Sequence, residues 1–398
     1  MASLAQEHDG LVIAIVRDSP AAHALETELR FFAANLPVLA FPDWETLPYD
    51  LFGPQPDIVS ERVATLYRLP SVKRGVLVVP VATSMQRLAP PGFIAGQSLV
   101  VEVGQRLSIE AEKRRLEAAG YRNVPQALDP GDFAVRGALL DIFPMGSPEP
   151  YRIELLDEEV DSIRSFDPDT QRSLHKVESV RMLPAREFPL DETSARNVRN
   201  LLRERFPIDP RRCPLYQDLK EGGAPSGIEY YLPLFFEQTA SLFDYLGGDA
   251  LCLIGEGAFE AADAFWRQTG ERYEQRRHDI ERPVLPPAEL FLPPDALRES
   301  LNKRQRVEVL GAAHPRWESA QALGDAKSPA LPLAQKGESG GAALKLFLDA
   351  YPGRVLVAAD SPGRREALSD TLANDGLRPP ILGDWAAFLA DDAPRWAI

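Results

Sequence analysis

The chain has 398 residues, of which 44% are hydrophobic and 26% are charged, and its formal net charge is −15. This composition is typical of a folded protein with roughly two to four domains, and no apolar run reaches the ~20 residues that cross a bilayer. The N-terminus lacks a signal-peptide pattern, and no membrane association is expected. A surface this acidic repels phosphates unless its basic residues are strongly segregated, so protein partners are expected before nucleic acid.

The N-terminal part alternates strands and helices. The run Leu11–Val16 is continuously apolar, as expected of a strand that is buried on both faces. Ser19 and Pro20 then open a helix, with Ser19 expected as its N-cap. Further strands are expected over 38–41, 75–81 and 99–103, with a helix over 58–69. This order predicts an open α/β sheet with crossover helices, and Gly104 marks its first boundary.

The central stretch 131–170 predicts three or more short strands joined by turns. Between residues 151 and 156 the side chains alternate, so Arg152, Glu154 and Leu156 should share a face exposed to water. Solubility alone does not explain an exposed leucine beside an arginine, although a small amphipathic sheet with one stray leucine remains the simple alternative. A helix over 110–119 and a strand over 177–183 complete an inserted α+β module.

The C-terminal half begins with a helix after Asp191 and continues with an aromatic run over 227–236, which should be core. A buried strand over 250–254 and a helix over 259–277 follow. From Leu310 to Gly341 the periodicity is lost, which indicates a linker. Beyond it a new βα pattern, with strands expected over 355–358 and 379–382, predicts part of a further α/β domain that stops at Ile398.

Motifs of catalysis are largely missing. No Gly-Lys dipeptide occurs, so no P-loop is present, and the acidic run from Asp157 to Glu159 is better explained as a hairpin turn than as a magnesium site. Asp43, Glu45 and Asp50 are expected to cap turns. The scattered histidines and the two unpaired cysteines indicate neither a triad nor a metal site, and suit a reducing compartment. We therefore expect no catalytic residue, cofactor or metal here, and a scaffold rather than an enzyme.

Several long segments identify a family. PDWETLPYDLFGPQPDIVSERVATLYRL (42–69), GVLVVPVATSMQRL (75–88) and the stretch 133–173 closely resemble the bacterial transcription-repair coupling factors, the Mfd family, and GIEYYLPLFFEQ and VLVAADSPGRREAL continue the match. The resemblance implies the N-terminal part of a larger protein with a UvrB-like fold. It implies a split parallel-sheet α/β domain 1 (1–103 and 186–309), an inserted small α+β domain 2 (104–185), a linker (310–340) and part of an α/β domain 3 (341–398).

The same resemblance implies a function. Domain 2 is expected to recruit the excision-repair protein UvrA where RNA polymerase has stalled, linking it to nucleotide excision repair. A C-terminal domain of the family covers this surface at rest. The ATP- and magnesium-dependent translocase motor of the family, and its contacts to RNA polymerase and DNA, are expected beyond Ile398. A degenerate helicase-like nucleotide hydrolase, or a DNA-binding fragment, is the alternative.

The UvrA-binding residues of the family fall on Arg136 and Arg152, and a third, aromatic position falls on Leu156, where this sequence departs from the pattern. A leucine keeps an apolar contact but offers less than an aromatic hot spot. Gly137 is expected to bulge and to re-aim Arg136. The alternative is that both arginines form ion pairs inside the domain, with Glu154 or Asp141.

Overall fold

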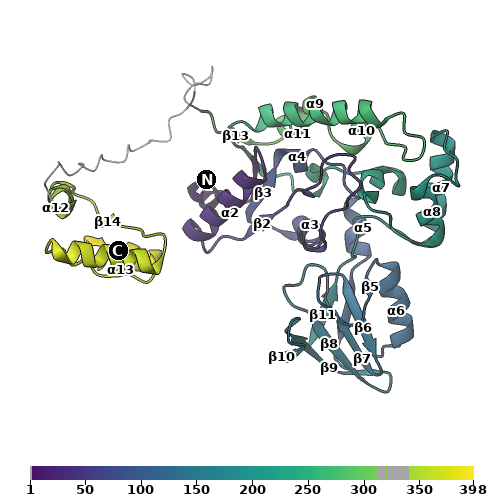
Figure 1. The fold of residues 1–398 in the computed structure, drawn as a ribbon, viewed down its shortest axis with the longest axis horizontal. Helices are drawn as coiled ribbons and strands as arrows, with labels where there is room; N and C mark the ends of the chain where they lie inside the picture. Colours follow the sequence, from purple (N-terminus) through teal and green to yellow (C-terminus); the bar gives the residue numbers. More distant parts are fainter. Residues whose placement is uncertain (1, 312–319, 321–339) are drawn as a thin grey trace. The chain divides into compact units, whose positions relative to one another are not determined.

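The computed structural model describes residues 2–311, 320 and 340–398, which fall into two compact units (Figure 1). Residues 2–311 belong to the first unit and residues 340–398 to the second. The predicted linker over 310–340 lies, apart from its ends and residue 320, outside the described residues.

A five-stranded parallel sheet forms the centre of the first unit, in the order β13-β12-β1-β3-β2. Its strands are β1 Leu11–Val16, β2 Val38–Ala40, β3 Gly75–Pro80, β12 Leu251–Ile254 and β13 Arg306–Glu308. All residues of β1, β3 and β12 are buried, which fits their unbroken apolar sequences. The chain therefore leaves this sheet after β3 and returns to it only at β12.

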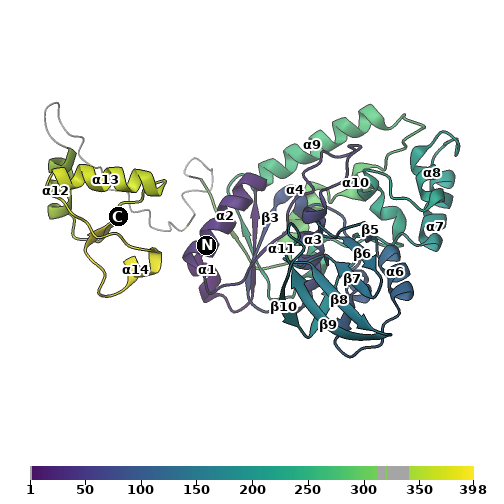
Figure 2. The same ribbon diagram turned by 60° about the horizontal axis from the view of Figure 1, so that its bottom comes forward.

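Helices cover both faces of this sheet (Figures 1 and 2). On one face the apolar side chains of α1 Ala2–Glu7 and α2 Ser19–Phe32 pack on alternate residues of β1 and β3. The other face carries α3 Pro56–Arg68, η1 Leu69–Ser71, α4 Val81–Ser84, α9 Ala258–Arg276 and α11 Pro294–Asn302. The N-cap of α2 is Asp18, whose Oδ1 accepts a hydrogen bond from the Ala21 amide at 2.8 Å; the expectation of Ser19 was wrong by one residue.

The remaining helices of this part lie in the segments that connect the strands: α5 Pro91–Gly96, α7 Glu192–Arg205, α8 Pro214–Glu221, η2 Ile228–Phe235, η3 Leu242–Tyr245 and α10 Pro287–Leu290. The aromatic run predicted as core forms the 3₁₀ helix η2, in which Ile228, Tyr230, Leu232 and Leu234 are buried. Asp191 caps α7 by accepting hydrogen bonds from the amides of Thr193 and Ser194.

A second, six-stranded sheet follows the order β10-β9-β8-β7-β6-β5 and is largely antiparallel. Its strands are β5 Arg122–Asn123, β6 Asp132–Arg136, β7 Leu139–Ile142, β8 Tyr151–Leu156, β9 Glu159–Phe166 and β10 Ser173–Val177. The helix α6 Ile109–Ala118 lies beside it, and in Figure 2 strands β8 and β9 come to the front. The residues predicted as one strand over 177–183 instead divide between β10 and a separate strand, β11.

The second sheet is reached and left through one two-stranded ribbon. Strands β4 Leu99–Glu102 and β11 Ser179–Met182 pair antiparallel, with Leu99 opposite Met182. The predicted boundary at Gly104 separates these two paired strands, and the domain limits themselves stay predictions. The mixed α/β fold, with a parallel sheet and an inserted α+β part, is confirmed.

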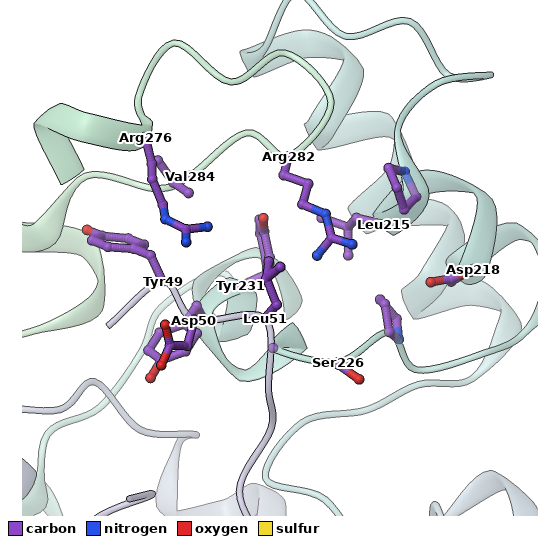
Figure 3. A pocket seen from close by; sticks show the side chains of 14 residues that line it. Tyr49, Asp50, Leu51, Leu215, Asp218, Ser226, Tyr231, Arg276, Arg282 and Val284 are labelled. Carbon is purple, nitrogen blue, oxygen red and sulfur yellow. The ribbon is translucent and has the colours of Figure 1, made fainter. Parts of the chain in front are cut away.

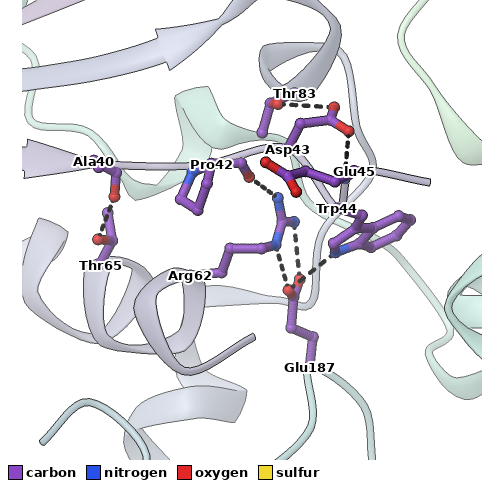
Figure 4. A network of polar contacts seen from close by, with 9 residues as sticks. All are labelled: Ala40, Pro42, Asp43, Trp44, Glu45, Arg62, Thr65, Thr83 and Glu187. Carbon is purple, nitrogen blue, oxygen red and sulfur yellow. Dashed lines mark hydrogen bonds and ion pairs between the residues drawn. The ribbon is translucent and has the colours of Figure 1, made fainter. Parts of the chain in front are cut away.

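A buried ion pair joins the segment after β11 to helix α3, which covers one face of the first sheet (Figure 4). Both side chains, Arg62 of α3 and Glu187, are almost completely buried, and Arg62 Nε lies 2.6 Å from Glu187 Oε1. Arg62 also donates to the Pro42 carbonyl oxygen, and its guanidinium lies over the rings of Phe41 and Trp44. A charge this deeply buried is tolerated because each of the three guanidinium nitrogens donates to an oxygen and the counter-charge of Glu187 is in contact.

The second unit consists of α12 Gly340–Ala350, β14 Val355–Leu356, α13 Pro362–Asn374, α14 Trp385–Leu389 and β15 Trp396–Ala397. Strands β14 and β15 pair in parallel. The strand predicted over 379–382 does not form, because Pro379 and Pro380 lack the amide hydrogens of a ladder. Pro380 and Leu382 instead bond to the backbone of Ile398.

Candidate partner-binding face

The predicted water-exposed face exists on β8 and extends to its neighbours. Ile153 and Leu155 are buried, whereas Glu154 and Leu156 are exposed, as the alternation predicts. Cross-strand pairing sets Asp141 opposite Arg152 and Leu139 opposite Glu154, and it places Arg136 beside Leu139. We call this surface the β6–β8 face: Arg136, Leu139, Asp141, Arg152, Glu154 and Leu156.

Asp141 is the organising residue of this face. Its side chain is completely buried, although it lies on the outer side of β7, because two arginines cover it. Arg152 binds it through two hydrogen bonds, Nε to Oδ1 at 2.7 Å and Nη2 to Oδ2 at 2.9 Å. Arg136 Nη2 donates to the same Oδ2 atom. One carboxylate therefore fixes the guanidinium groups of two strands.

Arg152 contacts Phe166 and Gln171 as well as Asp141. Its guanidinium lies 5.0 Å from the centre of the Phe166 ring, and Nη1 donates to the Gln171 carbonyl oxygen at 3.4 Å. Its side chain is only 19% exposed. The hydrogen bond to Asp141 raises the pKa of Arg152, so the group stays charged. This arginine shapes the face more than it projects from it.

Arg136 remains accessible. Its side chain is 45% exposed even though one nitrogen binds Asp141, so the other guanidinium donors face solvent. Gly137 follows directly with φ of +61° and forms, with Ala138, the two-residue turn between β6 and β7. The expected bulge at Gly137 is therefore wrong, because β6 and β7 pair in regular register. The register shifts described in this sheet lie between Glu154 and Leu155 and between Ser173 and Lys176.

Leu156 is the apolar group of the face and is 70% exposed. It ends β8 opposite Glu159, and the acidic run Asp157–Glu158 makes the two-residue hairpin turn that was predicted. An open hollow beside Leu156 is lined by Arg106 and the carboxylates of Asp157, Glu158, Glu159 and Asp161. Leu156 thus lies between the arginine pair and a strongly acidic edge.

The structure brings Arg136, Arg152 and Leu156 to one surface. Both arginines form ion pairs inside the domain with Asp141, which is the alternative given from the sequence. Whether the face binds a partner stays a prediction. Phe166, Gln171 and Arg106 were missed. The single aspartate inside the apolar run Leu139–Phe143 was the available signal for a charged contact on the outer side of β7.

The other expectations about sites concern carboxylates and metals. Asp43 accepts a hydrogen bond from the Glu45 amide and Asp50 accepts one from the Leu47 amide, so both cap turns as predicted. Among the described residues, no group of histidine, cysteine, aspartate and glutamate side chains is arranged to hold a metal ion. Within the same residues, no helix combines the length and apolar character that crossing a membrane requires.

Comparisons with known proteins match this architecture. A family described as the UvrB interaction domain matches residues 99–188, which contain the ribbon, the second sheet and the β6–β8 face. A second family, described as the D3 domain of MFD, matches residues 347–397 in the second unit. The two matches fall on different units of the structure.

Similar proteins were found in several bacteria. The transcription-repair-coupling factor of Escherichia coli is 42% identical over 95% of this chain, and that of Haemophilus influenzae is 38% identical over 95%. The protein of the same name from Myxococcus xanthus is 33% identical over 76% of the chain. The chain spans about one third of the length of the E. coli and H. influenzae proteins, whose aligned share is 33%.

Proposed function

We propose that this chain, which is related over 95% of its length to the transcription-repair-coupling factors, is an adaptor that recruits UvrA through the β6–β8 face. It would thereby link stalled transcription to excision repair. The observation that carries this proposal is the match of residues 99–188 to the UvrB interaction domain, together with the exposed Arg136 and Leu156 within it. The free, buried cysteines fit a cytoplasmic setting.

The chemistry of the face indicates what the partner must offer. The partner should present a carboxylate to Arg136, since a planar guanidinium binds carboxylates with two parallel hydrogen bonds. Leu156 calls for a shallow apolar pocket. The acidic hairpin beside it calls for lysine or arginine at the rim, where charges govern the association rate and the choice of partner.

The test is a binding titration of purified UvrA with this chain by calorimetry. We expect Arg136→Ala to weaken binding by ~1–3 kcal/mol, the usual range for an interface hot spot. The matched control is Arg114→Ala, which removes an exposed arginine from α6 rather than from the sheet. Equal affinities of the wild type and Arg136→Ala, with Leu156→Ala also unchanged, would exclude the face.

A variant of Asp141 tests whether UvrA binding depends on how the two arginines are held, since Asp141 itself is buried and cannot touch UvrA. Asp141→Asn keeps the shape of the side chain but removes the charge that binds both arginines. We expect it to weaken UvrA binding although Asp141 itself is buried, with a shift in the salt dependence of binding that a loss of stability alone does not produce. Unfolding curves of the same variant identify how much of the effect comes from stability.

We further propose that this chain neither turns over ATP nor binds RNA polymerase or duplex DNA, and that these activities belong to other parts of the longer relatives. A phosphate-release assay on the purified chain should stay at background. Turnover that saturates with ATP would favour the nucleotide hydrolase instead.

A last part of the proposal concerns masking. If a C-terminal domain covers the β6–β8 face in the longer relatives, this chain should bind UvrA more tightly than a full-length relative does. Equal affinities of the chain and the full-length E. coli protein for E. coli UvrA would argue against masking.

A further inference from the structure

A cavity of about 270 Å³ lies in the first unit, outside the second sheet (Figure 3). Its walls come from three places in the sequence: the loop after β2, the segment from α8 into η2, and the end of α9 with the loop that follows it. Tyr49, Tyr230 and Tyr231 form aromatic walls, and Pro214, Leu215 and Val284 add apolar surface. Nothing in the proposed function uses this cavity.

The hydroxyl groups of these tyrosines are already engaged. Tyr49 donates to the Leu285 carbonyl oxygen at 3.0 Å and Tyr231 to that of Pro283 at 2.7 Å. Tyr230 bonds to Thr46 and to the Leu47 carbonyl oxygen. With the hydroxyls occupied, the rings offer the cavity mainly apolar and π surface.

Two arginines provide the free charge of the cavity. Figure 3 shows the guanidinium groups of Arg276 and Arg282 on opposite sides of Tyr231. Neither side chain forms an ion pair or a hydrogen bond with any residue that the structure describes, although both are partly buried. By contrast, the neighbouring Arg205, Arg212 and Arg272 each form an ion pair with a carboxylate.

The acidic groups nearby are engaged elsewhere, with one exception. Asp50 binds Arg272 Nη2 at 2.7 Å, and Glu281 pairs with Arg212. Asp279 accepts hydrogen bonds from the amides of Glu281 and Arg282. Among the described residues that line the cavity, only Asp218 has a carboxylate with no such partner, and in Figure 3 it lies apart from both guanidinium groups. The cavity is therefore locally basic in a chain whose net charge is −15.

The loops that carry the rim also expose large apolar side chains. Leu51 lines the cavity and is 41% exposed, and Phe52 next to it is 73% exposed. On the opposite loop Ile280, two residues before Arg282, is 51% exposed. Tyrosine and arginine around a pocket, with apolar residues at its edge, form the usual composition of a protein-binding hot spot.

We propose that this cavity is a docking site for an acidic peptide segment of a partner protein, with one aromatic or leucine anchor and flanking carboxylates. The anchor fills the tyrosine-lined space and the carboxylates bind Arg276 and Arg282, a recognition mode known for arginine clusters. A nucleic acid strand fits less well, because the apolar rim offers it no phosphate contacts and the net charge repels a polyanion.

The experiment selects 12-residue peptides from a random display library on the whole chain, and measures the best ones by fluorescence anisotropy. We expect the selected peptides to carry an aromatic residue or leucine within about two positions of aspartate or glutamate. Arg276→Glu and Arg282→Glu should each weaken binding by roughly tenfold or more, because each reverses a charge at the contact. Arg277→Glu, on the same helix end but outside the cavity, should bind like the wild type.

Thermal unfolding of each variant establishes that the loops remain folded, and Arg276→Lys should retain part of the affinity. The proposal is overturned if no selected peptide depends on Arg276 and Arg282. It is equally overturned if a fluorescent single-stranded oligonucleotide binds more tightly than the best peptide and loses affinity in the same two variants.

Discussion

Asp141 shows how a single residue can turn an exposed strand face into a defined surface. Its buried charge is compensated by Arg152, which contributes two hydrogen bonds, and by Arg136, which remains half exposed. Removing either arginine would leave Asp141 less well compensated in a buried position, which is costly. Alanine substitutions of Arg136 and Arg152 therefore report on stability as well as on binding, and both quantities must be measured.

The first residue-scale prediction concerns Leu156. Replacing it by phenylalanine should increase the affinity for UvrA several-fold, roughly threefold to tenfold, because a larger ring buries more apolar surface in the same contact. The matched control is Leu174→Phe, since Leu174 is 60% exposed on β10, outside the β6–β8 face. Titrations with UvrA measure the affinity of both variants, and Leu174→Phe should bind like the wild type. A loss of affinity in Leu156→Phe would mean that the partner surface has no room for a ring.

A second residue-scale prediction concerns the two thiols. Cys213 and Cys252 are completely buried, and burial raises the pKa of Cys252 to about 11. Because the thiolate is the reactive form, neither should react with a thiol-specific reagent at pH 8 while the chain is folded. Colour release by Ellman's reagent should reach two equivalents only after denaturant is added; fast labelling of the native chain would show that the core opens.

At the scale of elements, the buried pair of Arg62 and Glu187 joins α3 to the segment that returns from the second sheet. Substituting Glu187 by alanine leaves the guanidinium buried and uncompensated. The expected loss in the free energy of unfolding is about 3–5 kcal/mol, measured by urea denaturation. Glu192→Ala is the control because it breaks an exposed pair with Arg196, which should cost less than about 1 kcal/mol. Similar losses for both would mean that the buried pair is dispensable.

Elements with a strong local pattern were predictable from the sequence. The apolar runs of β1, β3 and β12, the alternation of β8 and the two-residue turn after Leu156 follow from side-chain chemistry within a few residues. The prediction of a strand over 379–382 was wrong because the two prolines, which lack amide hydrogens, outweigh the apolar residues that follow them. The bulge was misplaced because a glycine after a strand fits a turn as well as a bulge.

The candidate site was predictable only in part. Alternation placed Arg152 and Leu156 on one face, and the family resemblance added Arg136. Burial of Asp141 beneath both arginines depends on cross-strand register and on the loop that contributes Gln171, and neither is encoded locally. The cavity around Arg276 and Arg282 could not be predicted, because its lining comes from three segments far apart in the chain.

At the scale of the first unit as a whole, Glu229 links stability to pH. Burial raises its pKa from 4.5 to about 7, with Glu187 adding to the rise and Arg186 opposing it. Its Oε2 atom is buried without a hydrogen-bond partner among the described residues. Between pH 4.5 and 7 the folded state holds the proton more strongly than the unfolded state does, so the free energy of unfolding falls as the pH rises through this window.

The corresponding prediction uses Glu229→Gln, which cannot ionise. At pH 8 the variant should be more stable than the wild type by roughly 2 kcal/mol, and at pH 5 the difference should be much smaller. Denaturant unfolding of both chains at the two pH values gives the answer. A difference that does not depend on pH would show that Glu229 does not titrate in this range.

The ribbon of β4 and β11 has a mechanical consequence for the inserted sheet. Both polypeptide crossings run side by side and are hydrogen-bonded from Leu99 and Met182 to Glu102 and Ser179. A pull on the sheet is carried by two covalent backbones in parallel, so it stretches no cross-strand bond, whereas a twist is resisted by the pairing. Contacts outside the ribbon, such as the hydrogen bond that the Gly146 amide donates to Ser60 Oγ at 2.8 Å, also hold the sheet against α3, so a protein docked on the β6–β8 face would keep a fixed orientation to the first sheet.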